Sequence, residues 1–209
     1  MPYPKFIFKR GAINEIDNKV PGLDTKAEIE GYVGYRTIEA GLVAKKGLDR
    51  LNAILQPRKS RDKKKRWRED SLAVAFFGDI RTVADIKAIR RRLERAHHRL
   101  DKHQLTIRLL PQDRASSEDT IAHNTGSFVT PNRFVLFPNW FAKNNIDQAG
   151  IIIHELLHDW LIDHKVKDGS KRVRAYGVRL AQKLAKDRPS AARRNPENIH
   201  QFCIAVWSS

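Results

Sequence analysis

The fold is decided by the stretch GIIIHELLHDWLIDH, which runs from Gly150 to His164. It contains His154 and His158, four residues apart, with Glu155 directly after the first. An α-helix turns by about 100° per residue, so both histidines lie on one face and can bind one ion. Glu155 lies beside them, where its carboxylate can take a proton from an attacking water and pass it to the leaving amine. The stretch therefore predicts a zinc site on a buried helix and disfavours the alternative of two ordinary core histidines.

Catalytic zinc normally has three protein ligands and one open position, so a third ligand is required. His164 stands where the metzincin pattern HExxHxxGxxH places its third histidine, but Leu161 replaces the glycine that turns the chain. A continuous helix would carry His164 about 240° around the axis from His158, away from the metal. The only methionine is Met1, so the methionine turn of metzincins is absent as well. The metzincin interpretation is therefore rejected.

Outside this stretch, the hydrophobic periodicity predicts helices packed beside a small antiparallel or mixed sheet, which is the α+β class. Helices are expected over residues 35–55, 82–102, 147–161, 174–187 and 195–208, and strands over 5–10, 104–110, 121–129 and 133–141, with a turn at 130–132. Residues 1–34 are punctuated by proline and glycine and are expected to form an N-terminal arm. The catalytic domain is expected to cover residues 35–209.

Two further segments follow the histidine pair, GSKRVRAYG at 169–177 and NPENIHQF at 195–202. Together with HELLH they resemble the aspzincins, the deuterolysin and peptidyl-lysine metalloendopeptidases, whose motifs are HExxH, GTxxDxxYG and a closing N-A-D-x-Y-x-x-F helix. The segments FVTPNRFVLFPNWF and FFG upstream are also similar to this family. The resemblance covers residues 37–209. It implies a zincin-like metallopeptidase fold, a Zn²⁺ cofactor and a protein or peptide substrate.

The resemblance also implies roles for individual residues. His154 and His158 correspond to zinc ligands, Glu155 to the general acid/base, and Tyr176 to the phenol that steadies the oxyanion. Without the resemblance, Tyr176 reads as half-buried packing at the start of a helix. A lysine preference, found in part of the family, would need an acidic group in the substrate pocket, and Glu197 is the candidate.

The third ligand does not carry over from the family. Laying GTxxDxxYG on GSKRVRAYG puts Val173 in the position of the ligating aspartate. Asp168, in the loop KVKDGS, and His164 are the favoured replacements, with Asp163 nearby and His200 more remote. Both favoured residues have ordinary alternatives, since Asp168 begins a turn pair with Gly169 and His164 is a cation at a helix end.

The chain is strongly basic, with 40 Lys and Arg against 24 Asp and Glu and a formal net charge of +16. Such a field favours anionic partners. The run Arg58–Arg68 is expected to be a solvated loop, or else a contact for phosphates with Trp67 available to stack on a base. These features support a second hypothesis, a catalytically weakened zincin-fold module that binds nucleic acid or another anionic partner through its basic surface.

Cysteine content and leader signals bear on the compartment. Cys203 is the only cysteine, so an intramolecular disulfide is excluded, and its apolar neighbours indicate a buried residue. No signal peptide and no run of 18 apolar residues is present. The protein is therefore expected in the cytoplasm of its producer or delivered by a non-classical secretion route, as in bacterial members of the family that resemble toxin or effector modules.

Overall fold

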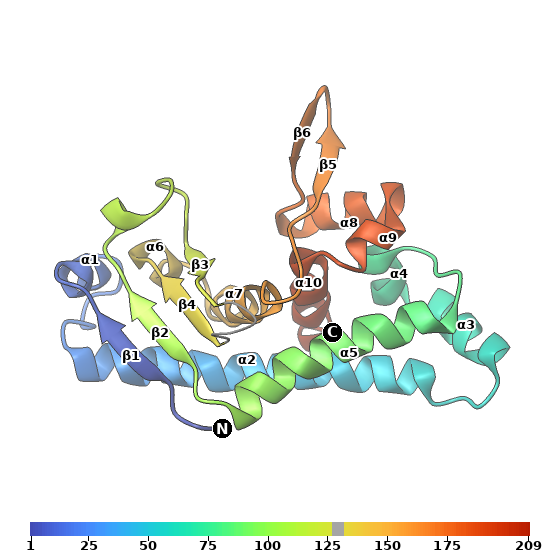
Figure 1. Cartoon of the computed structure of the whole chain (residues 1–209), viewed down its shortest axis with the longest axis horizontal. Helices are drawn as coiled ribbons and strands as arrows, with labels where there is room; N and C mark the ends of the chain where they lie inside the picture. The colour runs from blue at the N-terminus through green and yellow to red at the C-terminus, as the bar shows by residue number, and fades with distance from the viewer. Residues whose placement is uncertain (127–131) are drawn as a thin grey trace. The chain divides into compact units, whose positions relative to one another are not determined.

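The computed structural model describes residues 1–126 and 132–209 and divides them into two compact units. Unit 1 consists of Met1–Leu42 and His97–Asp159, and unit 2 of Val43–Ala96 and Trp160–Ser209. Helices α2 (Lys26–Leu55) and α5 (Val83–Lys102) each contribute residues to both units. The expected boundary at residue 34 coincides with no break, because α2 runs through it. Figure 1 shows the order of the elements along the chain.

Unit 1 is built around a four-stranded mixed sheet. Its strand order is β1 (Lys5–Phe8), β2 (Thr106–Leu109), β4 (Arg133–Leu136) and β3 (Ala122–Asn124). The first three strands are parallel, and β3 pairs antiparallel with β4 at the edge. The four expected strands are therefore present, and β1 shows that residues 1–34 contribute to the sheet. Most of the expected turn and the end of the 121–129 strand lie in residues 127–131, outside the described residues.

Short helices surround this sheet. Residues 1–34 also form α1 (Ala12–Asp17), and the 3₁₀ turn η1 (Gln112–Arg114) follows β2. The strand expected over 133–141 ends early, because Pro138 begins α6 (Pro138–Phe141) and cannot donate to a sheet.

The helix with the two histidines, α7 (Asn145–Leu157), belongs to unit 1 and begins at an N-cap, where the Asn144 side chain accepts the Asp147 N–H at 2.9 Å. Gln148, which is fully buried, donates to the carbonyls of Trp140 and Phe141 and accepts from the Tyr32 hydroxyl at 3.0 Å. A buried amide is tolerated only when its polar atoms are hydrogen-bonded, so these contacts fix the start of α7 against α6 and α2.

Unit 2 is mainly helical. It contains α3 (Ser60–Glu69), α4 (Ser71–Phe77), α8 (Gly177–Asp187), α9 (Pro189–Ala192) and α10 (Pro196–Trp207), together with most of α5 and the end of α2. The expected loop over the basic run was wrong, because residues 60–69 are helical. Trp67 anchors that helix. Its ring is fully buried and its Nε1–H donates to the Gly78 carbonyl at 3.0 Å, so it is not available to stack on a base.

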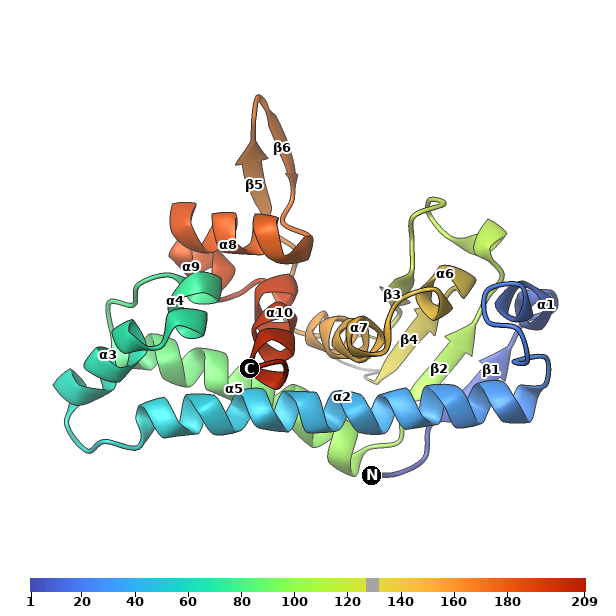
Figure 2. The same cartoon turned by 180° about the vertical axis from the view of Figure 1, so that it is seen from behind.

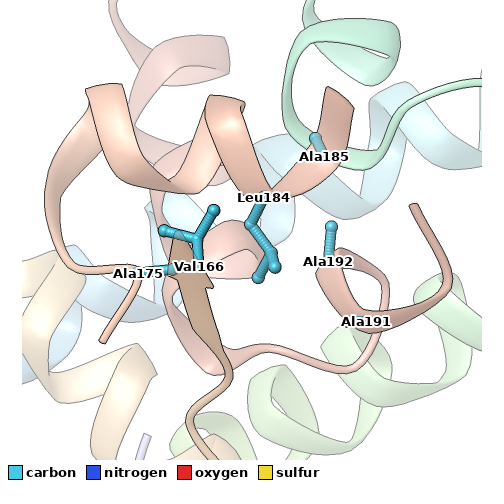
Figure 3. Packing of buried hydrophobic residues seen from close by; sticks show 6 residues of the cluster. All are labelled: Val166, Ala175, Leu184, Ala185, Ala191 and Ala192. Atoms are coloured by element: carbon cyan, nitrogen blue, oxygen red, sulfur yellow. The ribbon is translucent and has the colours of Figure 1, made fainter. Parts of the chain in front are cut away.

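Unit 2 also contains a β-hairpin where a loop was expected. Strands β5 (Lys165–Asp168) and β6 (Lys171–Arg174) pair antiparallel around a turn in which Gly169 has φ 59°, a conformation that favours glycine. Val166 packs with Ala175, Leu184, Ala185, Ala191 and Ala192, as Figure 3 shows. The strands then extend away from α8, which is visible in both Figure 1 and Figure 2.

None of the helices in the described ranges combines the length and apolar character that a membrane crossing requires.

Candidate metal centre

The two histidines of α7 are close enough to share one ion. The Nε2 atoms of His154 and His158 are 3.0 Å apart, and their rings meet edge to face with centroids 4.7 Å apart. Two nitrogens on one tetrahedral zinc, each about 2.05 Å from the metal, lie about 3.3 Å apart. His154 and Glu155 are buried, whereas His158 is half-buried at the end of the helix. The donor types, their separation and their burial therefore fit a zinc ion.

The end of α7 is tied to the edge strand of the sheet. The Asn124 side chain, on β3, donates both to the Glu155 carbonyl and to Asp159 Oδ1, the latter at 3.0 Å. Asp159 also forms an ion pair with Arg99, and its side chain is 1% exposed. These contacts hold the C-terminal turn of α7, and with it His158, against β3. Nothing in the sequence pattern indicates Asn124, since the contact joins residues 31 and 35 positions apart in the chain.

In unit 2, Tyr176 is held by two charged residues. Its hydroxyl donates to Asp163 Oδ2 at 2.5 Å and accepts from Arg174 Nη1 at 3.2 Å. Arg174 and Asp163 are themselves 3.8 Å apart, and the Asp163 side chain is 13% exposed. Burial, followed by the Asp163 carboxylate, raises the pKa of Tyr176. The phenol is therefore a neutral hydrogen-bond donor in a fixed orientation beside a carboxylate.

The hairpin separates Asp163 and Tyr176 in sequence but joins them in space. Asp163 and His164 directly precede β5, and Ala175 and Tyr176 directly follow β6. The Ala175 N–H donates to the His164 carbonyl at 3.0 Å and closes the base of the ribbon. Val173, expected at the position of the family's aspartate, lies opposite Val166 in the hairpin and packs against its apolar cluster. Its side chain has a packing role.

The two favoured candidates for the third ligand have other partners within unit 2. The Asp168 carboxylate forms a two-fold contact with Arg179, at 3.0 and 2.7 Å, which lowers its pKa. The main-chain N–H of His164 donates to Asn195 Oδ1 at 3.1 Å. Burial lowers the pKa of the half-buried His164 ring, with smaller contributions from Arg194 and Arg188. Asp168 is therefore neutralised by a cation, whereas the His164 ring is kept uncharged.

The start of α10 holds the segment around His164 in place through side-chain hydrogen bonds. Asn195 Nδ2 donates to Asn198 Oδ1, and Asn198 Nδ2 donates to the carbonyls of Phe76 and Ala181 at 2.6 and 2.7 Å. The family-like NPEN sequence thus fixes the neighbourhood of His164 through buried amides.

Glu197 and His200 of α10 contact other residues of unit 2. Glu197 is buried and accepts the Gly177 N–H at 2.8 Å, so its carboxylate orients the residue that follows Tyr176. His200 Nδ1 is 3.6 Å from Glu197 Oε2. The expectation that Glu197 lines a pocket for a substrate lysine is therefore not supported by its contacts within unit 2.

The excess of positive over negative charge lies in one of the two units. Unit 2 contains 28 Lys and Arg against 11 Asp and Glu, whereas unit 1 contains 12 against 13. In unit 2 the arginines are dense enough to affect one another. Burial lowers the pKa of Arg92, and the nearby Arg194, Arg91, Arg95 and Arg193 lower it further. The helix with the histidine pair thus belongs to a nearly neutral unit, and the segment with Tyr176 to a strongly cationic one.

The helix with the histidine pair and the α+β architecture are typical of zincin-like metallopeptidases. A solved structure that shares the fold is a zinc peptidase from Grifola frondosa, with a TM-score of 0.57 and 14% sequence identity over 83% of this chain and 94% of that chain. At this identity the likeness establishes the fold, which confirms the expected fold class. No protein-family model matches the chain, and no curated protein matches it significantly.

Proposed function

We propose that this protein is a zinc-dependent metalloendopeptidase of the aspzincin type. The observation that carries the proposal is the pair of imidazole nitrogens 3.0 Å apart on α7, with the buried Glu155 beside them. Zinc held by His154 and His158 would supply a Lewis acid that polarises a peptide carbonyl. Glu155 would accept a proton from the attacking water and deliver it to the amine that leaves.

Tyr176 is proposed to donate its hydroxyl hydrogen bond to the oxyanion that forms on the substrate carbonyl. Burial and the Asp163 carboxylate support this role, because they raise the pKa of Tyr176 and favour its protonated form, whereas Arg174 acts in the opposite sense. The single O–H, which is donated to Asp163 in the structure, would turn to the oxyanion when substrate is bound.

For the third zinc ligand we propose Asp163. If the ten hairpin residues 165–174 are treated as an insertion, the flanking residues read Asp-His-Ala-Tyr-Gly, which matches the D-x-x-Y-G part of the family pattern. The hydrogen bond from Ala175 to His164 supports this alignment, because it brings the two flanks together at the base of the hairpin. Asp163 also directly contacts Tyr176, whereas Asp168 is paired with Arg179. His164 remains the alternative.

The central experiment compares wild-type protein with Glu155→Gln on casein. Glu155→Gln retains the shape of the side chain but cannot act as a base, so cleavage is expected to fall at least about 100-fold. Zinc is expected at one per chain in both proteins and to be lost in His158→Ala. Glu118→Gln, an exposed glutamate of the same unit, is the matched control and should cleave normally. Casein cleavage by Glu155→Gln at the wild-type rate would refute the proposal.

The charge of unit 2 favours a second candidate function, an inactive zincin fold that binds nucleic acid. This candidate predicts zinc-free protein and nanomolar binding of DNA or RNA that weakens steeply with salt. Metal analysis of protein purified without chelators separates the two functions. Proposals of toxin or effector activity, and of delivery by a non-classical secretion route, rest on the family resemblance alone and need secretion assays in the producing organism.

A further inference from the structure

The hairpin β5–β6 has one apolar face and one strongly cationic face. Val166 and Val173 lie opposite each other and pack against α8. The other face pairs Lys165 with Arg174 and Lys167 with Arg172, so that like charges are directly opposed twice. Like charges in this position destabilise a two-stranded ribbon.

The hydrogen-bond pattern brings these charges close together. The bond from Ala175 to His164 makes that pair a hydrogen-bonded one, so the pairs Lys165–Arg174 and Lys167–Arg172 are of the other type. Opposed Cα atoms in such pairs are only about 4.5 Å apart. The two pairs are two residues apart along the strands, which corresponds to about 6.7 Å. The face is therefore a compact array of four cations.

Acidic residues do not neutralise this array, except at its base. Within residues 1–126 and 132–209, Lys165, Lys167 and Arg172 form no ion pair, and all three are exposed. Arg174 alone is engaged, by Asp163 and the Tyr176 hydroxyl. The one acidic side chain of the ribbon, Asp168, is paired with Arg179. The three cations that remain are Lys165, Lys167 and Arg172. They begin opposite Arg174, which contacts Tyr176, and continue along the ribbon.

We propose that this face of the hairpin binds acidic side chains of an extended polypeptide substrate. An extended peptide presents every second side chain on one side at a spacing of about 6.7 Å, which matches the spacing of the two cation pairs. Carboxylates at alternate positions, such as Glu-x-Glu, can therefore meet both pairs at once. Because the hairpin begins two residues after Asp163, the acidic side chains should lie within about five residues of the cleaved bond.

This inference rests on the proposed peptidase function and deepens it, since it assigns a substrate class. It differs from a lysine preference, because the cations beside Tyr176 would repel a basic segment. A duplex nucleic acid is the competing occupant. The observations favour a peptide, because the cations form one short array at the tyrosine and the tryptophan of the basic run is buried in the core.

The test measures binding separately from cleavage. Glu155→Gln protein is titrated into fluorescein-labelled peptides that share one sequence, with Glu, Gln or Lys at two alternate positions, and anisotropy is recorded at 50 and 500 mM NaCl. The Glu peptide is expected to bind about tenfold more tightly than the Gln peptide at low salt and within about threefold at high salt. The Lys peptide is expected to bind more weakly than both.

The variant Lys165→Gln/Lys167→Gln/Arg172→Gln is expected to lower the Glu-to-Gln affinity ratio to below about twofold. The variant Arg81→Gln/Lys87→Gln/Lys186→Gln removes the same charge from exposed positions elsewhere in unit 2 and should keep the ratio above about fivefold. Equal loss in both variants would overturn the assignment to the hairpin, because it would show an effect of net charge alone.

Three further outcomes decide between this inference, the competing nucleic-acid partner and the proposed peptidase function. If labelled duplex DNA binds at least tenfold more tightly than the Glu peptide and the hairpin variant abolishes that binding, the partner is nucleic acid and the inference is wrong. If wild-type protein cleaves casein but the Glu and Gln peptides bind equally, the peptidase stands and the inference fails. If casein is not cleaved but the hairpin-dependent ratio is found, the acidic-peptide site stands and the peptidase fails.

Discussion

Replacing Asp163 by asparagine tests the third ligand of the proposed zinc site. Asparagine keeps the size of the side chain and one carbonyl oxygen, so the hydrogen bond from Tyr176 can be retained. It removes the charge that a zinc ligand supplies. Zinc bound by four protein ligands is worth about 10–16 kcal/mol, or about 2.5–4 kcal/mol per ligand. At about 1.4 kcal/mol per factor of ten, Asp163→Asn should weaken zinc binding by at least about 60-fold.

Competition with a chromophoric zinc chelator at pH 7.5 measures this change, and circular dichroism verifies that the variant is folded. Asp168→Asn is the matched control. It removes an equal charge but breaks only the exposed contact with Arg179, which is worth less than about 1 kcal/mol, so zinc affinity should change less than about twofold. The reasoning is refuted if Asp163→Asn binds zinc like the wild type, or if Asp168→Asn loses as much affinity. A loss in His164→Ala alone would assign the ligand to His164.

Three further predictions concern packing in unit 2. In Gly47→Ala the new Cβ would lie 2.8 Å from Cys203 Sγ, so the free energy of unfolding in urea should fall by about 1–3 kcal/mol. In Gly31→Ala, in the same helix, the new Cβ meets nothing within 4 Å, so the free energy of unfolding should rise by about 0.5–1 kcal/mol. Asn198→Ala leaves two buried carbonyls without their donor and should cost about 2–4 kcal/mol, and a loss below about 1 kcal/mol in urea unfolding would contradict this. Burial raises the pKa of Cys203, so the thiol stays protonated as the pH rises through 9. Cys203 should therefore react with a thiol reagent only as fast as the protein unfolds, and rapid labelling at pH 8 would disprove this.

The sequence predicted the features that depend on local pattern. The helix over 82–102 and the strands at 5–10 and 104–110 appear, because their periodicity of apolar residues is strong. The helix expected over 147–161 appears only in part, because α7 ends at Leu157. The basic run was expected as a loop because its charges dominate the composition. Residues 60–69 are nevertheless helical, and the buried Trp67 anchors this helix to the Gly78 carbonyl. A single buried residue produces no repeating pattern of apolar residues in the sequence.

The histidine pair could be read from the sequence because its spacing of four residues is a property of one helix. The environment of Tyr176 could not, because it depends on how residues 165–174 fold. A contiguous pattern placed Val173 in the position of the aspartate, whereas the hairpin makes Val173 a packing residue. The alternating sequence KVKD and KRVR around Asp168–Gly169 was the available signal for that hairpin.

The hairpin leaves and rejoins the rest of the chain at one hydrogen-bonded pair of residues. Its length can therefore change without moving its two ends. Because His164 and Ala175 meet at the base of the hairpin, residues can be added or removed in cross-strand pairs at the turn without altering the separation of Asp163 and Tyr176. The position of the tyrosine is thereby uncoupled from the length of the ribbon, and Arg174 is the one ribbon residue that contacts its hydroxyl. A designer who wished to redirect this protein could keep Arg174, exchange the rest of the ribbon for one of other chemistry, and leave the contacts of both flanks in place.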